Sequence, residues 1–265
     1  MAPMIRAVLP PAFRPVQPPS LVRLGRAYDG GYLIDSRDIM ASDSLVSLGV
    51  YDDCSFERAF VKQRNVPVLA YDGSIDGRYF ARRIYRSAVD RHPKVFLKSI
   101  ALLADYLWFF SGRRRHVKSF VASDTLVPSV SLAQVFDRIQ KPNLRKPLLK
   151  IDIEGAEYKI LDELVARADA TAALAIEFHD CDQHLEEIER FIERYPLRLV
   201  HIHANNFGEP VSASGIPYSL ELTFSSSPQQ ETDVVLPHPL DMPNKRGAEE
   251  VAISFAARAT EANNK

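Results

Sequence analysis

A chain of 265 residues, 46% hydrophobic and 25% charged, is long enough to bury most of its apolar surface and has the composition of a soluble globular enzyme. Its formal net charge of −1 argues against a general nucleic-acid-binding protein, which would carry a strongly basic balance. The two cysteines, Cys54 and Cys181, are too few for a disulfide framework and fit a reducing, cytoplasmic compartment.

The first residues, "MAPMIRAVLPPAFRPVQPP", lack the continuous apolar core of a signal peptide, and their prolines predict an extended arm. Such an arm could pack on a neighbouring subunit, so an oligomer stays open. An Asp-Gly-Gly within 26–34 predicts the turn of a hairpin, which either covers a cofactor cleft or serves as a simple structural turn.

Short apolar runs then alternate with amphipathic ones, which indicates a mostly parallel sheet with helices on both faces. The segment 76–130 is harder to interpret, and we expect a helix, a strand and an inserted helical portion there. Its most apolar part is interrupted by Lys98 and Asp105 and is shorter than the roughly 20 residues of a membrane span. We therefore expect no stable membrane insertion, with an interfacial helix at 97–110 as the alternative. The expected strands lie at 44–51, 66–74, 147–153, 172–180, 197–206 and 218–226.

The last two strands are joined by a loop too short for a helix crossover, so they are expected to pair antiparallel. The fold class predicted is α/β, a seven-stranded, mostly parallel, Rossmann-like sheet of the kind found in class I methyltransferases. We expect an N-terminal arm and hairpin at 1–43, a main domain at 44–226 with a helical insertion around 76–130, and a C-terminal extension at 227–265.

Ligands of open α/β sheets bind at the carboxyl ends of the strands, which directs attention to the polar residues there. Asp72 follows Gly49 by about the spacing at which a second-strand acid meets a ribose, although Asp72 and Gly73 could also form a plain turn. The first loop, "GVYDD", has one glycine and does not match G-x-G-x-x-G, so NAD and FAD are disfavoured. Acids at the strand ends favour the positive sulfonium of S-adenosylmethionine.

The string "LLKIDIEGAEYKIL", 148–161, places three acids around one glycine at the end of a buried strand. Asp152 and Glu154 share a strand face because they are two residues apart. Gly155 allows a tight turn into the next helix, and Glu157 fits a favourable acid of that helix's first turn.

A second constellation joins "IEFHD" and "HIHANN", the ends of two later strands. Either His179 or His203 could act as a general base on a hydroxyl acceptor. Alternatively Asp152, Glu177, His179 and His203 could bind a divalent metal, or the histidines could simply be hydrogen-bonded strand ends. The arginines at 82, 83, 86, 91 and 113–115 line an entrance for an anionic acceptor or form a solvated face.

"LLKIDIEGAEYKIL", "SLGVYDDCSFERAF" and "VPVLAYDGSI" resemble the FkbM-type branch of the class I S-adenosylmethionine-dependent methyltransferases. The resemblance covers most of residues 20–226 and is weakest over 76–130. It implies transfer of a methyl group to a hydroxyl of a small-molecule or saccharide-like acceptor. The competing interpretations are a metal-dependent O-methyltransferase, a non-catalytic cofactor-binding module and a nicotinamide oxidoreductase.

Carried over residue by residue, the resemblance implies that Gly49 and the loop after it, with Tyr51 and Asp53, face the cofactor. It implies that Asp72 and Gly73 meet the ribose, and that Asp152 lies where the methyl group and the acceptor meet. Asp152 and one of His179 or His203 would then manage the acceptor proton.

Overall fold

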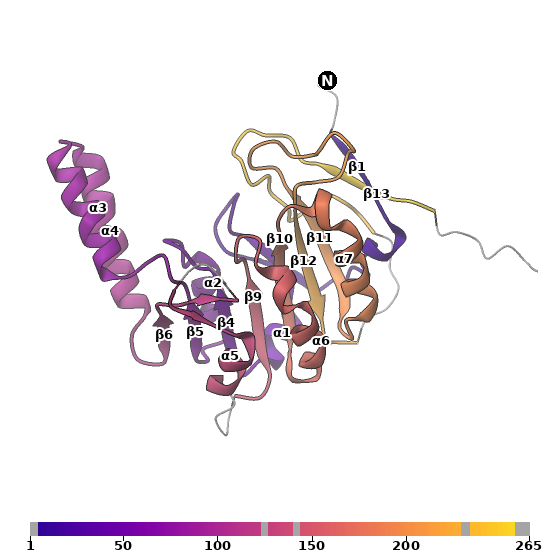
Figure 1. The fold of residues 1–265 in the computed structure, drawn as a ribbon, viewed down its shortest axis with the longest axis horizontal. Helices are drawn as coiled ribbons and strands as arrows, with labels where there is room; N and C mark the ends of the chain where they lie inside the picture. The colour runs from indigo at the N-terminus through magenta and orange to yellow at the C-terminus, as the bar shows by residue number, and fades with distance from the viewer. Residues whose placement is uncertain (1–4, 123–126, 140–143, 229–233, 258–265) are drawn as a thin grey trace, which may run out of the picture.

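The computed structural model describes residues 5–122, 127–139, 144–228 and 234–257 and contains a seven-stranded sheet (Figure 1). The strand order is β11-β12-β10-β9-β4-β5-β6, and β12 pairs antiparallel with both of its neighbours while the other pairs are parallel. The predicted fold class is confirmed, including the antiparallel last pair. The strands are β4 (Ser44–Leu48), β5 (Val68–Tyr71), β6 (Arg114–Val117), β9 (Pro147–Ile151), β10 (Ala173–Phe178), β11 (Arg198–Asn205) and β12 (Ser219–Ser225).

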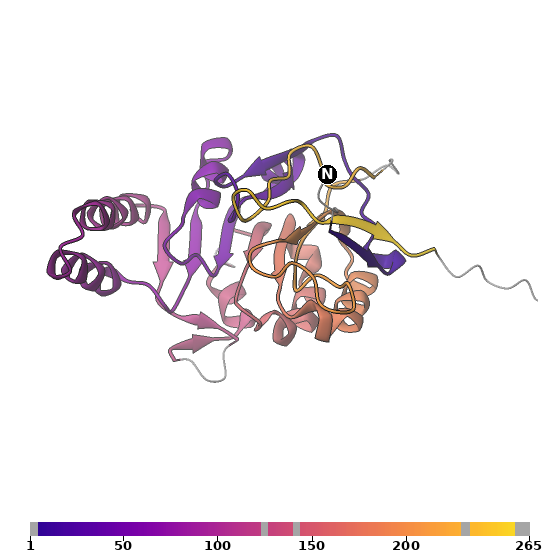
Figure 2. The same ribbon diagram turned by 90° about the horizontal axis from the view of Figure 1, so that it is seen from above.

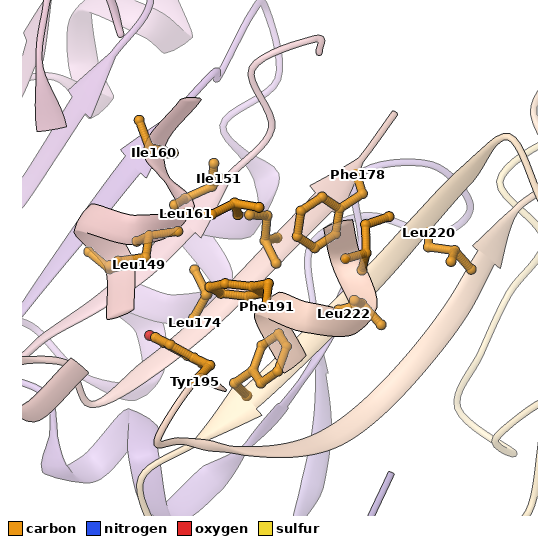
Figure 3. Packing of buried hydrophobic residues seen from close by; sticks show 14 of the residues in the cluster. Leu149, Ile151, Ile160, Leu161, Leu174, Phe178, Phe191, Tyr195, Leu220 and Leu222 are labelled. Atoms are coloured by element: carbon orange, nitrogen blue, oxygen red, sulfur yellow. The ribbon is translucent and has the colours of Figure 1, made fainter. Parts of the chain in front are cut away.

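One face of the sheet is covered by helices α5 (Leu132–Ile139), α6 (Leu161–Ala166) and α7 (Cys181–Arg194). Successive strand residues point to opposite faces, so Leu149 and Leu174 enter this core while their neighbours do not. Figure 3 shows Phe191 of α7 packed among these strand side chains. Leucine and phenylalanine side chains of the strands and of the covering helices thus pack together. This packing explains why the strands are continuous apolar runs in the sequence.

The opposite face is covered by the N-terminal hairpin, β2 (Leu21–Leu24) and β3 (Tyr32–Asp35), with α1 (Ser36–Ala41) and α2 (Ser55–Gln63). In Figure 2 these indigo-to-purple segments lie on the other side of the sheet from the orange helices. The hairpin loop spans 25–31 and is wider than the tight turn expected from Asp-Gly-Gly. Gly25 makes it possible, because a Cβ there would lie 2.1 Å from the carbonyl oxygen of Gly30.

The two ends of the described chain lie side by side, because β1 (Arg6–Leu9) pairs in parallel with β13 (Ala252–Phe255). Parts of the predicted terminal extensions, 1–4, 229–233 and 258–265, fall outside the described residues. The short elements are η1 (Pro11–Phe13), η2 (Glu157–Ile160), η3 (Ala168–Ala170) and the pair β7 (Phe120–Val121) and β8 (Ser129–Val130).

Between β5 and β6 the chain forms two helices, α3 (Gly77–Val89) and α4 (Pro93–Phe109). Asp76 caps α3 by accepting a hydrogen bond from the backbone N–H of Tyr79 at 2.8 Å, and Pro93 opens α4 where a proline is tolerated. The pair extends beyond the edge strand β6 in both ribbon views (Figures 1 and 2). None of the helices in the described part of the chain is both long and apolar enough to cross a membrane.

Candidate active site

A cavity of about 440 Å³ opens at the carboxyl ends of β4, β5 and β9. Its size suits a ligand of small-molecule or cofactor dimensions. Four of the strand-end residues selected from the sequence line it: Gly49, Tyr51, Asp72 and Asp152. The remaining lining comes from Val50, Tyr71, Ser74, Ser119, Phe120, Val121, Ile153, Glu154, Gly155, Ala156 and Lys159.

The backbone conformation and the close packing at position 49 require a glycine. Its φ is +77°, and a Cβ at this position would lie 1.7 Å from the carbonyl oxygen of Asp152. The loop after β4 therefore crosses close over the end of β9, and a single glycine suffices for that approach.

Asp72 holds the same loop from the other side. Its Oδ2 accepts hydrogen bonds from the backbone N–H groups of Val50 (3.0 Å) and Tyr51 (2.7 Å). Its Oδ1 accepts from the backbone N–H and the hydroxyl of Ser74. Burial alone would raise the pKa of Asp72, but these hydrogen bonds outweigh it and hold the pKa below its usual value.

Phe120, which sequence reasoning missed, also lines the cavity. A Cβ at Gly73 would lie 2.3 Å from its ring, so the glycine makes room for Phe120 instead of lining the cavity itself. No local pattern could have paired these residues, because Phe120 follows the hairpin of α3 and α4 and returns to the site through β6.

Tyr51 and Asp53, both expected at the cofactor, separate in the structure. Tyr51 lines the cavity, and its hydroxyl lies 3.1 Å from that of Tyr79; this hydrogen bond, together with burial, raises the pKa of Tyr51 to about 12. Asp53 is outside the lining and pairs with Arg26 of the N-terminal hairpin at 3.1 Å while accepting from Ser55. Asp53 therefore tethers the hairpin to the start of α2.

Lys150 is the second residue that sequence reasoning missed. It is buried in β9, and its Nζ donates to the carbonyl oxygen of Gly49 (2.8 Å) and to Oδ2 of Asp152 (3.1 Å). Burial would lower the pKa of Lys150, but the negative charges of Asp152 and Glu57 outweigh it and raise the pKa. A charged lysine thus ties the glycine loop to the acid at the strand end. Its position two residues before Asp152, on the same strand face, was the available signal.

His179 faces three acids with one ring nitrogen. Its Nε2 lies 4.0 Å from Oδ1 of Asp152, 3.7 Å from Oε2 of Glu154 and 3.9 Å from Oε1 of Glu177. Asp152, Glu154 and His179 present ligand atoms within 4.8 Å of one another. The structure therefore brings His179 to the end of "KIDIEG".

The other ring nitrogen of His179 is fixed by Glu157. Nδ1 lies 3.2 Å from Oε1 of Glu157, which is fully buried and also accepts from the backbone N–H of Ile153. Burial would lower the pKa of His179, but the Glu157 hydrogen bond and the charge of Glu177 raise it to about 9. Glu157 does lie in the first turn of η2, as expected, and its contact with His179 is an additional role.

Glu177 is buried beside this group. Its Oε2 accepts from the Tyr32 hydroxyl (3.1 Å) and its Oε1 from the side-chain amide of Asn205 (2.8 Å). Burial, with the charges of Asp152 and Glu221, raises the pKa of Glu177 to about 8. A carboxyl of this kind changes its protonation state near neutral pH.

His203 lies in a different group. Its Nδ1 is 3.3 Å from Glu221 and its Nε2 is 2.9 Å from Glu250, so both ring nitrogens are already engaged by carboxylates. Cross-strand pairing places Glu177 opposite Glu221 and Glu221 opposite His203. The four residues named as a metal set are therefore divided: Asp152, Glu177 and His179 come together, and His203 is held two strands away.

Comparison with known families gives a match over part of the chain. Residues 88–199 match the family described as the methyltransferase FkbM domain. This part of the chain is similar to FkbM methyltransferases. The match includes Asp152, Glu157 and His179, extends over much of the segment where the resemblance was weakest, and covers less than half of the chain. Family and strand order together support a methyl-transferring enzyme.

Several solved structures are distantly similar to the chain. They include a fibrillarin/Nop5p complex (11% identity, 69% of this chain and 72% of that one, TM-score 0.37) and a precorrin-6y C5,15-methyltransferase from Geobacter metallireducens (13%, 71% and 84%, 0.36). An rRNA methylase from Streptococcus thermophilus matches at 11% identity over 72% and 93% of the two chains, with a TM-score of 0.34. These likenesses carry no argument about function. No curated protein matches the chain.

Proposed function

We propose that this FkbM-type domain transfers a methyl group from S-adenosylmethionine to a hydroxyl oxygen of a small-molecule or saccharide-like acceptor. The observation that carries the proposal is the cavity where the ends of β4, β5 and β9 meet, lined by Gly49, Asp72 and Asp152. S-adenosylmethionine supplies an electrophilic methyl group on a positively charged sulfur, and the acceptor hydroxyl must lose its proton.

The residues of the cavity fit this cofactor. The Phe120 ring offers an apolar surface for the adenine, and the Asp72 carboxylate an acceptor for the ribose hydroxyls. Four hydrogen bonds already occupy Asp72, so a ribose hydroxyl would replace the Ser74 hydroxyl at Oδ1. Asp152 and Glu154 supply negative charge for the sulfonium.

The acceptor side of the site is proposed to be the group around His179. A neutral His179 would accept the hydroxyl proton at Nε2 while Glu157 holds Nδ1. Since the pKa of His179 is about 9, this proton acceptor becomes available as the pH rises toward that value. Glu177, whose pKa is about 8, is the neighbouring carboxyl that would share the proton.

Calorimetric titration of the full chain with S-adenosylmethionine and S-adenosylhomocysteine tests the proposal. We expect binding with one site per chain, weakened by Phe120→Ala and unchanged by Phe207→Ala, an exposed phenylalanine far along the sequence. Absence of binding heat from a folded sample would reject the cofactor. Binding without turnover of any hydroxylated acceptor would instead favour the non-catalytic module.

A divalent metal is a second candidate, favoured by the position of Nε2 of His179 among three carboxylates. A metal-bound histidine commonly donates its other nitrogen to a carboxylate, as Nδ1 could to Glu157. The ligand set proposed is Asp152, Glu154 and His179, with Glu177 adjacent. Mixed nitrogen and oxygen ligands suit Mn²⁺ or Zn²⁺ better than Mg²⁺.

Thermal unfolding with and without Mn²⁺, after chelator treatment, decides this point. Saturating metal should raise the stability by about 3 kcal/mol at 100 times the dissociation constant. His179→Gln and Glu154→Gln should lose the increase, and His203→Gln should keep it because its ring nitrogens face Glu221 and Glu250. An equal response in His179→Gln and the unmodified protein would rule out this site.

We also propose that 44–226 is the catalytic unit and that the described parts of 1–43 and 227–265 cover its sheet. In support, Tyr32 of the hairpin donates to Glu177, and Asn244 of the C-terminal segment donates to Glu221 at 2.7 Å. Asp29 and Asn244 are joined by a backbone hydrogen bond, so the two extensions meet over the same strands.

A further inference from the structure

The hairpin of α3 and α4 carries an apolar surface that the rest of the described chain leaves exposed. On α4, Leu97, Ile100, Leu107 and Trp108 are between 42% and 65% exposed. Their spacing of three, seven and one residues places them on one face of the helix. A single exposed leucine is ordinary, but four large apolar side chains along one helix face mark an interaction surface.

The neighbouring helix carries exposed apolar side chains of its own. Tyr85 and Val89 of α3 lie four residues apart on one face of that helix and are 70% and 59% exposed. Both helices stand beyond the edge strand β6 (Figures 1 and 2). The hairpin therefore reaches outward from the sheet with its apolar side chains facing solvent.

The charge of the hairpin indicates what it contacts. Residues 77–109 hold seven basic and two acidic residues, a balance of +5, whereas the chain as a whole carries −1. One of the two acids, Asp105, pairs with Arg58 outside the hairpin. The basic side chains are Arg78, Arg82, Arg83, Arg86, Arg91, Lys94 and Lys98.

A basic cavity is lined mostly by α3 and shares no residue with the apolar face of α4. It measures about 420 Å³ and is lined by Arg82, Arg86, His92 and Lys118, among others. Of its four lysines and arginines, Arg83 pairs with Asp52 and Lys118 with Asp76, and the cavity also contains the acid Asp90. Such a cavity could hold a phosphate group, because guanidinium and ammonium groups donate charge-assisted hydrogen bonds to its oxygens.

We propose that the hairpin of α3 and α4 docks the protein on an anionic lipid surface, with its apolar face in the interface and its basic residues on the headgroup phosphates. Helices that lie in a membrane interface combine tryptophan and leucine on one face with lysine and arginine beside it. A second copy of the chain is the less favoured occupant, because it would bring two hairpins of +5 together. The proposal is independent of the proposed function.

The hairpin of α3 and α4 lies next to the candidate active site. Asp76, which caps α3, follows Asp72 and Ser74 of the first cavity, and Ser74 lines both cavities. A bilayer bound to the hairpin would therefore lie on the β6 side of the candidate active site.

Flotation of the full chain with lipid vesicles tests the proposal. We expect at least about tenfold stronger partitioning onto vesicles of phosphatidylcholine mixed with phosphatidylglycerol than onto phosphatidylcholine alone. Leu97→Ser/Leu107→Ser should lower the partition coefficient about tenfold or more, because both side chains leave the interface. Arg82→Gln/Arg86→Gln should lower it about fivefold per charge removed. Phe207→Ser, which removes an exposed apolar side chain outside the hairpin, should leave it unchanged.

Two results would overturn the docking. The first is a failed flotation: the protein does not float, or it floats equally with both kinds of vesicle. Flotation that Leu97→Ser/Leu107→Ser leaves unchanged, in a variant whose thermal unfolding matches the unmodified protein, counts as the same result. The other is a dimer in lipid-free solution, measured by light scattering, that Leu97→Ser/Leu107→Ser converts to a monomer. That dimer would assign the face to a second copy of the chain.

Discussion

The Nδ1 atom of His179 lies 3.2 Å from Oε1 of Glu157, a fully buried carboxylate, although the two residues belong to different strand–helix units. This contact fixes the imidazole plane and turns Nε2 toward Asp152, Glu154 and Glu177. The acid at the end of "KIDIEGAE" thus orients the histidine of "IEFHD". Under the proposed function, Nε2 of His179 is the atom that would accept the hydroxyl proton.

Glu157→Gln keeps the shape of this side chain and removes its charge. The pKa of His179, about 9 in the folded protein, should then fall by about one unit, because a charged hydrogen-bond acceptor no longer stabilises the imidazolium. The measurement is a titration of the histidine ring protons by NMR in metal-free buffer. Glu163→Gln is the matched control, and an unchanged midpoint in Glu157→Gln would contradict the role of Glu157.

Gly49→Ala should destabilise the fold by about 3–5 kcal/mol, because the new Cβ would meet the Asp152 carbonyl at 1.7 Å and φ is positive. Gly155→Ala provides the comparison. Gly155 also has a positive φ, +91°, but a Cβ added there would have no neighbouring atom within 4 Å, so about 1–2 kcal/mol is expected. Urea unfolding measures both, and equal losses would show that the close approach to Asp152 is unimportant.

The proposed contact of Asp72 with the ribose can be tested separately from its hydrogen bonds to the loop, by comparing ligands with and without ribose hydroxyls. If its carboxylate meets the ribose, adenosine should bind about 1.5–3 kcal/mol more tightly than 2′,3′-dideoxyadenosine. Asp72→Asn should reduce this difference, and Ser74→Ala should preserve it. A difference that survives Asp72→Asn would limit Asp72 to holding the backbone of Val50 and Tyr51.

The protonation of His203 should make the stability of the fold depend on pH. Burial would lower the pKa of His203, but its hydrogen bonds to Glu221 and Glu250 raise it well above the ordinary value of 6.5. The folded state therefore keeps a proton on His203 that the unfolded state releases. The stability that this proton provides is fully present below pH 6.5 and is lost as the pH rises. The free energy of unfolding should fall by about 1.4 kcal/mol per pH unit from this group above neutrality.

His203→Gln should remove this part of the slope when urea unfolding is repeated between about pH 6.5 and pH 9. The exposed His92 supplies the control substitution, His92→Gln, which should leave the slope unchanged. A slope that is identical in His203→Gln and the unmodified protein would show that the pair with Glu221 and Glu250 does not hold the proton.

The sheet and the cavity could be predicted because both depend on local pattern. Apolar runs ending in polar residues indicated the strands, and the carboxyl ends of parallel strands must meet, so Gly49, Asp72 and Asp152 were expected together. The cavity contains all three. Asp53 has the same local context, but its side chain turns to Arg26, and nothing in "GVYDD" indicated that hairpin contact.

Other parts of the site depend on contacts between distant segments. Lys150 sits in an apolar strand, and its partner Gly49 comes from a different strand–loop unit. His203 resembled His179 in sequence, and the difference between them is made by Glu250, 47 residues along the chain. Phe120 reaches the cavity only because the hairpin of α3 and α4 returns the chain to β6.

The central claim is that the cavity at the ends of β4, β5 and β9 holds the methyl donor. A crystal structure of the full chain with S-adenosylhomocysteine tests it most directly. We expect the ligand in this cavity, with its ribose hydroxyls on Asp72, its adenine against Phe120 and its sulfur nearest Asp152. Electron density for the ligand at another place in the fold, with this cavity filled by solvent, would contradict the account.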